Sequence, residues 1–430
     1  MNSTTGDRMK WVFLFGIYFC AESVGALTLE EAISIALSQN PEIRMTEASL
    51  EEAEGARIVS RSQFFPQLTA QGTYTRFSRV SRFGGMEFGE PNNYLGQILL
   101  EQSLFTWGKV QNNYRIARLN REASEEELRK VRVEVIFRVK ETFYRILFLK
   151  EYLRLVEDSY RQVEHHARIV SIRYEEGIAS RFDLIRANVE TSNLKPEISR
   201  VRNTLELATL TLKDLIGVDR DFPLEVQGEL STFGREVRAI HELPLQEALE
   251  VAKGNRPEMK SLLLRREMAE RSLSLAKARN KPNLVALGRF NYRNPYDFVD
   301  QWGSDADITL SLVLPIFDGF ATQGDVRQSK ARLSEVSQLL SVVSDQLDIE
   351  VEGTFLLLKE AEERIGSQRE SVKEAEEGLV IAERQYQSGV LTNLEFLDAQ
   401  LALTRAKTNY LQAMNDYLVS NAMMEKVLGR

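Results

Sequence analysis

The side chains that most often catalyse reactions or bind metals are scarce and poorly spaced in this sequence. Of the three histidines, His165, His166 and His241, the first two are adjacent on a predicted helix. Their rings therefore point about 100° apart, and no metal-ligand spacing exists. Neither a nucleophile elbow nor a phosphate-binding loop occurs in the chain. The residues predict that the protein is not an enzyme and has no metal or cofactor.

One pair of carboxylates has a spacing that suits a charged site. Glu395 and Asp398 are three residues apart, which places both on one face of a helix that begins just after Gly389. The segment Thr392-Asn-Leu-Glu395 is also a capping-box pattern, and Ser180-Arg-Phe-Asp183 repeats it earlier in the chain. Glu395 is therefore a candidate for a helix cap as well as for a charged site, whereas Asp398 has no cap role.

These residues are positioned by a repeated framework, because the whole sequence consists of two similar halves. A shift of 216 residues aligns Leu27-Thr-Leu-Glu-Glu-Ala32 with Leu243-Pro-Leu-Gln-Glu-Ala248, and Asn-Pro41-Glu42 with Arg-Pro257-Glu258. A shift of 212 residues aligns Arg173-Tyr-Glu-Glu-Gly177 with Gln385-Tyr-Gln-Ser-Gly389. The repeated order predicts a tandem duplication of a unit of roughly two hundred residues.

The first residues have the pattern of a secretory signal. Arg8 and Lys10 precede an apolar run to Cys20, and Val24-Gly-Ala26 supplies small residues at a cleavage spacing. This predicts a signal peptide over residues 1–26, with an uncleaved anchor or a lipidated Cys20 as the alternatives. Cys20 is the only cysteine, so a chain cleaved after residue 26 has no thiol for redox chemistry. The net charge of -8, with both signs interspersed, argues against a nucleic-acid partner.

Four segments alternate between apolar and polar residues and predict β-strands at 66–79, 93–105, 282–293 and 305–317. The alternating run within each is about ten residues long, which suits a tilted crossing of a bilayer, and aromatic residues crowd the strand ends. The edge of a β-sandwich would have the same pattern, so alternation alone does not establish a membrane. In lipid an open sheet edge is not tolerated, and closure of four strands would require several copies of the chain.

Long helices account for most of the remaining sequence. The first repeat, 27–217, is predicted to hold helices in 28–63 and a helical hairpin at 108–216. A connector, 218–242, leads to the second repeat, 243–430, with helices in 244–280 and a hairpin at 320–428. Heptads without glycine or proline between Gly108 and Gly177 predict a helix about 100 Å long, and Gly177 and Gly389 end the outgoing helices. Pro196 predicts a kink in the first returning helix.

The combination of these segments resembles the TolC family of outer-membrane efflux and secretion ducts. The resemblance rests on the doubled order of short sequences, including Phe-Pro66-Gln-Leu, Leu314-Pro-Ile-Phe-Asp-Gly319, Tyr386-Gln-Ser-Gly389 and Phe396-Leu-Asp-Ala399. It implies an α+β membrane protein with an internal duplication. In that fold, four strands per protomer complete a homotrimeric 12-stranded β-barrel, and antiparallel helical hairpins continue it as a periplasmic tunnel.

The resemblance also assigns candidate gate residues at the tunnel mouth. It implies that Glu395 and Asp398 line the constricted entrance, and that Asp183 and Tyr386 match positions that keep it shut by polar links. A third position, basic in the family, is Leu391 here, so that link cannot form in the same way; Arg181 and Arg186 are candidate substitutes. The alternative is that Tyr174 and Tyr386 are heptad core residues.

The expected function is that of a passive exit duct in the outer membrane of a Gram-negative bacterium, as part of a tripartite efflux or type I secretion system. The implied partners are a periplasmic adaptor protein, which would contact the hairpin tips at Gly177, Gly389 and Leu391, an inner-membrane pump and the lipid of the outer membrane. The alternative is a periplasmic coiled-coil tether with no transport role, which explains the heptads but not the two-faced strands.

Overall fold

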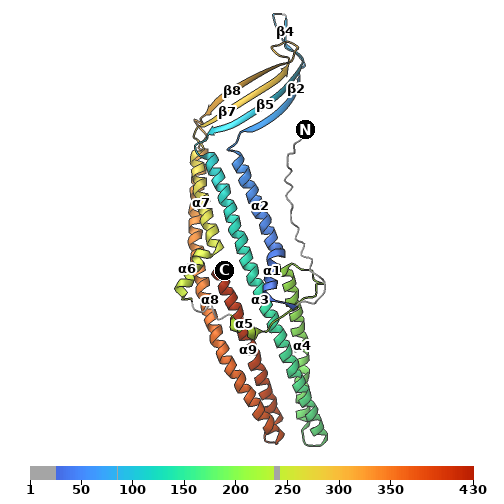
Figure 1. Cartoon of the computed structure of the whole chain (residues 1–430). Helices are drawn as coiled ribbons and strands as arrows, with labels where there is room; N and C mark the ends of the chain where they lie inside the picture. Colours follow the sequence, from blue (N-terminus) through green and yellow to red (C-terminus); the bar gives the residue numbers. More distant parts are fainter. Residues whose placement is uncertain (1–25, 85, 237–242) are drawn as a thin grey trace, which may run out of the picture.

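The computed structural model describes residues 26–84, 86–236 and 243–430. The predicted signal peptide, apart from Ala26, lies outside the described residues, and so does His241. Figure 1 shows an elongated molecule with a β-sheet at one end and long helices that run to the other. Among the described residues, none of the helices combines the length and the apolar character that a membrane span requires.

Four strands form one antiparallel sheet in the order β2 (Gln67–Arg76), β5 (Asn92–Phe105), β7 (Asn283–Asn294) and β8 (Gly303–Val313). The pair β5–β7 joins the two halves of the chain, and β2 and β8 are the edge strands of this sheet. The predicted strand 305–317 extends too far, because Pro315 has no N–H to donate to a ladder. A small hairpin of β3 (Ser81–Phe83) and β4 (Met86–Phe88) projects beyond the sheet (Figure 1).

The two longest helices, α3 (Lys109–Glu175) and α8 (Ala321–Gln387), have 67 residues each and run from the sheet to the far end of the molecule. At about 1.5 Å per residue each is about 100 Å long. The shorter helices that pack against them are α2 (Pro41–Ser62), α4 (Arg181–Ile216), α7 (Pro257–Ala278) and α9 (Asn393–Val427). The result is a single layer, ordered α2-α3-α7-α8 next to the sheet and α4-α3-α9-α8 beyond it.

A band of short elements packs against this layer at mid-height. It consists of α1 (Leu29–Gln39), α5 (Leu230–Glu236), α6 (Leu245–Asn255) and a two-stranded parallel sheet of β1 (Ala26–Leu27) and β6 (Glu225–Val226). The connector thus contributes both a short strand and a helix. The ring of Phe233 on α5 lies 6.1 Å from that of Phe143 and 5.6 Å from that of Tyr144. These contacts belong to the main hydrophobic core, which the band completes.

Each returning helix ends against the start of a helix from its own repeat. Asn40, the N-cap of α2, accepts hydrogen bonds from two backbone N–H groups of α2, and its amide Nδ2 donates to the carbonyl of Leu215 at 2.8 Å. In the second repeat, Arg256 precedes α7 and its Nη1 donates to the carbonyl of Lys426 at 3.1 Å. The repeated Asn-Pro and Arg-Pro sequences are therefore the two helix junctions. α4 is continuous through Pro196, where the sequence predicts a kink.

Candidate channel entrance and duct wall

Both helical hairpins turn at a glycine in the left-handed region of backbone conformation. Gly177 has a φ of 75° and Gly389 has a φ of 76°. In each turn the residue after the glycine donates its N–H to the carbonyl five residues earlier, at 2.8 Å in the first hairpin and 2.9 Å in the second. This bonding satisfies the last carbonyls of α3 and α8 and ends both helices at the predicted glycines.

The carboxylates that follow these turns cap the returning helices. Oε2 of Glu395 accepts hydrogen bonds from the backbone N–H of Thr392 at 2.8 Å and from its hydroxyl at 2.7 Å. These bonds hold the pKa of Glu395 below its ordinary value, because they stabilise the charged form. Asp183 forms the equivalent capping box with Ser180. Glu395 is therefore a helix cap, while Asp398 lies exposed one turn further along α9.

Tyr386 belongs to a cluster that joins the two hairpins, which we call the entrance clasp: His166, Tyr386, Asn393 and Phe396. The ring of His166 lies 5.1 Å from that of Tyr386 and 4.5 Å from that of Phe396. Nε2 of His166 is 2.6 Å from Oδ1 of Asn393. The amide Nδ2 of Asn393 donates to the backbone and carboxylate oxygens of Asp183, each at 3.5 Å. The clasp therefore consists of residues from α3, α8 and α9 and contacts α4 through Asp183.

The other candidate tip residues have fewer contacts. The guanidinium of Arg173 lies 4.8 Å from the centre of the Tyr386 ring. Within the described part of the chain, neither Arg181 nor Arg186 forms an ion pair. Leu391 is half-buried beside the second turn. Neither of these two arginines therefore replaces, within the described residues of the protomer, the link that Leu391 removes.

The seam between α3 and α9 is polar as it approaches the hairpin tips. Oγ of Ser159 and Oγ1 of Thr404 are 3.2 Å apart, and Nε2 of Gln400 donates to Oε1 of Gln162 at 3.1 Å. The hydrogen bond of His166 forms the next step toward the tip. By contrast, the seam inside the first hairpin is apolar near the tip, where Ala167, Val170, Ala187 and Leu184 pack together.

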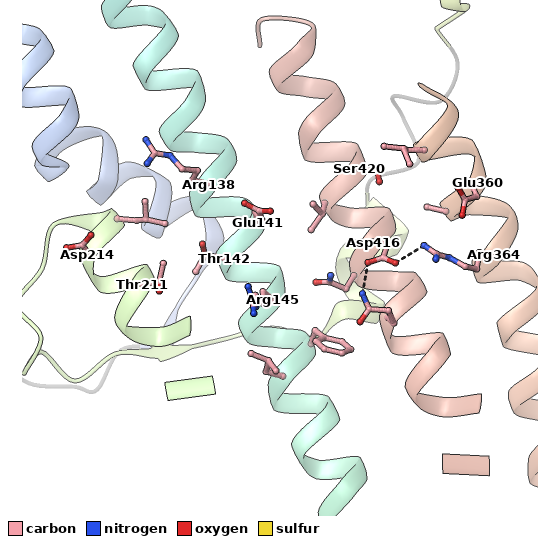
Figure 2. A pocket seen from close by; sticks show the side chains of 18 residues that line it. Arg138, Glu141, Thr142, Arg145, Thr211, Asp214, Glu360, Arg364, Asp416 and Ser420 are labelled. Carbon is pink, nitrogen blue, oxygen red and sulfur yellow. Dashed lines mark hydrogen bonds and ion pairs between the residues drawn. The ribbon is translucent and has the colours of Figure 1, made fainter. Parts of the chain in front are cut away.

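Figure 2 shows a groove of about 970 Å³ at mid-height, lined by side chains of α3, α4, α8 and α9. Glu141 and Arg145 of α3 face it, and Arg364 donates to Asp416 at 2.6 Å across α8 and α9. Glu141 lies about 200° around the helix from Phe143, which contacts the mid-height band. The groove therefore opens on the side of the helical layer that faces away from that band.

The four-stranded sheet has one apolar and one polar face. On the apolar face of the edge strand, Ile308 is 86% exposed, and Leu310 and Leu312 are also exposed. On the polar face, Asn291 bonds to Gln97 at 2.9 Å and to Asp305 at 2.8 Å. Further ion pairs on this face join Arg289 to Asp307 and Arg293 to Asp305. The apolar face suits lipid and the polar face suits water.

Aromatic side chains mark both ends of the strands. At the loop end, Tyr74 contacts Tyr94 at 5.0 Å between ring centres, and Trp302 stacks on Tyr292 at 4.9 Å. At the helix end the ring contacts are Phe105 with Trp107 and Phe317 with Phe320. Two aromatic rows on either side of an exposed apolar band are the pattern of a membrane-spanning barrel wall.

The model of the family described as outer membrane efflux protein matches residues 32–218 and 248–430, and so covers both repeats. The chain belongs to the outer membrane efflux protein family. Family membership confirms the predicted outer-membrane location and the function of an efflux or secretion channel. It does not support the alternative of a periplasmic tether. The family consists of channel proteins rather than enzymes.

The matches to relatives and solved structures extend over nearly the whole of this chain. The alkaline protease secretion protein AprF of Pseudomonas aeruginosa is 21% identical over 431 residues, which is 98% of this chain and 88% of the relative. The cobalt-zinc-cadmium resistance protein CzcC of Cupriavidus metallidurans is 25% identical over 441 residues, with 100% and 95% coverage. The outer membrane protein VceC of Vibrio cholerae shares the fold at a TM-score of 0.80 and 18% identity, over 93% of this chain and 96% of that one.

Of the four residues in the entrance clasp, only Tyr386 is predicted from the sequence as a candidate gate residue. The spacing of His166 excludes it as a metal ligand and indicates no other role, and Asn393 belongs only to a capping-box pattern. One signal for the clasp is present in the sequence. His166 follows Val163 by three residues, so a polar ring occupies a position on the buried face of a heptad helix. A polar residue on such a face often fixes how helices are paired.

Proposed function

We propose that three copies of this chain close around a common axis into a duct that carries cargo out of the periplasm through the outer membrane. The observation that carries the proposal is that the sheet and the long helices of the protomer form one layer, which is open along both edges. β2 and β8 end the four-stranded sheet, and the helices at the edges expose large apolar side chains. Examples are Met45 and Val59 on α2, Leu207 on α4, and Ile349 and Leu356 on α8.

Closure of the barrel by sister subunits satisfies both edges. Unpaired N–H and C=O groups of an edge strand are very costly in lipid, so β2 of one copy would pair with β8 of the next. Three copies of the four-stranded sheet give twelve strands. A barrel of that size leaves an open lumen, whereas eight strands leave an interior that side chains fill.

The same closure decides which side of the helical layer faces the lumen. Twelve helices about 10 Å apart make a ring about 40 Å across. Three mid-height bands would fill such a ring if they lay inside it, so the band belongs outside. The groove of Figure 2, with Glu141, Arg145 and the Arg364–Asp416 pair, then faces the transported cargo. The duct wall at this level carries both signs of charge.

The entrance of the duct would be selective for charge. Glu395 and Asp398 from three copies give six carboxylates around the axis, and such a ring attracts cations. The capping bonds of Glu395 are compatible with this role, because they keep its carboxylate ionised. Asp398 is exposed beside it on α9. Asp183 and Tyr386 would act less directly. Tyr386 is a member of the entrance clasp, and Asp183 contacts the clasp through Asn393.

The hairpin tips would meet a periplasmic adaptor protein that connects the duct to an inner-membrane pump. Around the turn glycines Gly177 and Gly389, the large apolar side chains of Ile178, Phe182 and Val390 are exposed. The sequence has no phosphate-binding loop, so the energy for transport would come from the pump. The names of the relatives cover protease secretion and metal resistance, and the duct chemistry is compatible with either cargo.

The oligomer is tested by extraction and by mass. The protein should require detergent to leave the membrane and should have the mass of three chains when light scattering is corrected for bound detergent. A monomer that dissolves in salt without detergent would overturn the proposal and favour a periplasmic scaffold.

The charged entrance is tested by single-channel recordings in planar bilayers. The double variant Glu395→Ala with Asp398→Ala should lose most of the block by divalent and trivalent cations. The matched control, Glu175→Ala with Glu176→Ala, removes two exposed carboxylates beside the other turn and should keep the block. Equal block in both double variants would reject the entrance role of Glu395 and Asp398.

A further inference from the structure

Two adjacent histidines occupy opposite environments near the entrance. His165 is exposed, whereas His166 is only 4% exposed and lies in the seam between the two hairpins. Its hydrogen-bond partner, Asn393, is 6% exposed and is the first residue of α9. A titratable ring is thus buried at the end of the polar seam that joins the two hairpins, close to their tips.

The hydrogen bonds of the clasp fix the direction of each donor. Nδ2 of Asn393 donates to the oxygens of Asp183, so its Oδ1 is the group that faces His166. The 2.6 Å contact then requires that Nε2 of His166 carry the hydrogen. In the neutral ring this leaves Nδ1 without a proton. Protonation therefore leaves the bond to Asn393 in place and adds a charge to a buried ring.

The surroundings of His166 disfavour that charge. Burial is the main cause that lowers the pKa of His166, and the positive charges of Arg173 and His165 on its own helix lower it further. The hydrogen bond to Asn393 opposes these effects in part. From the other elements, α8 presents the Tyr386 ring, α9 presents Phe396 and Asn393, and α4 presents Asp183, which is reached through the amide of Asn393.

We propose that the neutral imidazole of His166 holds the two hairpins together at the entrance and that its protonation loosens the α3–α9 seam, so that the duct opens more readily in acid. The proposal rests on the proposed duct function and adds to it a response to periplasmic pH. His166 is a positioning residue here, because it acts on the entrance through α9 rather than by contact with cargo.

The sign follows from linkage between the closed and loosened states. In the loosened state the ring is hydrated and titrates near its ordinary value of 6.5, while in the closed state the pKa is lower. The loosened state then binds more protons as the pH falls below 6.5. Closure is fully favoured above that pH and weakens below it, by up to about tenfold in the closed-to-open ratio per pH unit and per subunit, until the pH reaches the closed-state pKa.

The test is single-channel recording of the full-length oligomer between pH 7.5 and 5.5. The wild type should open more often as the pH falls. His166→Gln keeps an amide N–H that can donate to Asn393 but does not titrate, so its open probability should change little over this range. The matched control, His165→Gln, removes the exposed neighbour, whose charge has the smallest of the effects on the pKa of His166, and should keep most of the acid response. Glu395 and Asp398 are present in all three proteins, so the acidic entrance cannot account for a difference.

A second variant keeps the proposal testable if His166→Gln does not assemble. Ser159→Cys with Thr404→Cys replaces two hydroxyls that are 3.2 Å apart across the same seam. With the disulfide formed, acid should no longer increase opening, and a reductant should restore the response. An equal acid response in the wild type and His166→Gln, or in the oxidised double cysteine variant, would overturn the inference while the duct still conducts. The absence of any pore at any pH would instead overturn the duct itself.

Discussion

A substitution at Asn40 tests how the start of α2 and the end of α4 are joined in the first repeat. Its side chain is 3% exposed, its Oδ1 accepts from the N–H groups of Glu42 and Ile43, and its Nδ2 donates to the carbonyl of Leu215. Asn40→Ala removes the helix cap, which costs about 1 kcal/mol. It also leaves the partly buried carbonyl of Leu215 without a donor, which costs about 1–3 kcal/mol. The junction should therefore lose about 2–4 kcal/mol in total.

Amide hydrogen exchange in the detergent-solubilised protein measures this loss at the junction itself. Because about 1.4 kcal/mol corresponds to a tenfold change, amides at the start of α2 and the end of α4 should exchange roughly 30-fold to 900-fold faster. Asn40→Ser keeps a cap acceptor but is too short to reach Leu215, so it should lose only about 1–3 kcal/mol. The equivalent junction at Arg256 is an internal reference and should be unchanged.

Two results would refute this account of the junction. Faster exchange by the same factor at both junctions would mean that the variant loosens the whole protomer. An increase below about fivefold at the Asn40 junction would mean that the carbonyl of Leu215 finds another donor, since that factor corresponds to only about 1 kcal/mol.

Further predictions concern the turns, the cap and the sheet. Gly217→Ala should destabilise the protein more than Gly177→Ala in thermal unfolding, because both glycines have positive φ but only at Gly217 would a Cβ lie 2.7 Å from a backbone oxygen of α1. Because the pKa of Glu395 is lowered, its cap should hold above pH 4.5 and weaken as the pH falls below it. The protection factors of the first α9 amides, which are corrected for the pH dependence of intrinsic exchange, should follow this course in the wild type and stay constant in Glu395→Gln. Ile308→Lys on the apolar face should cost about 2–4 kcal/mol for folding into lipid vesicles, whereas Thr309→Lys on the polar face should cost little, and equal costs would contradict the assigned faces.

The fold could be predicted because its signals are local. Period-two alternation around Ile308 or Asn291 and the uninterrupted heptads between Gly108 and Gly177 each specify an element without reference to distant residues. The turn glycines were also recognisable, since a left-handed residue at a helix end is a property of a few neighbouring positions. The duplication added a second copy of every signal against which the first could be checked.

The entrance and the junctions were harder, because their contacts join residues far apart in sequence. His166 and Asn393 are separated by 227 residues, and Asn40 and Leu215 by 175. The sequence indicates Asn40 only as the residue before a helix-starting proline, whereas the structure shows that its amide also donates to the carbonyl of Leu215 on α4. Periodicity indicates which face of a helix is buried but not which helix covers it.

The end-to-end junctions also determine how the duct wall would respond to mechanical load. α3 and α8 are unbroken from the sheet to the entrance. Their neighbours in the wall are pairs of helices joined end to end, α2 with α4 by the hydrogen bond of Asn40 and α7 with α9 by that of Arg256. Unbroken helices and jointed pairs of helices therefore alternate around the wall. Torque applied at the tips would be transmitted to the membrane end mainly along α3 and α8, while the jointed pairs would allow the lower half to twist without straining the barrel.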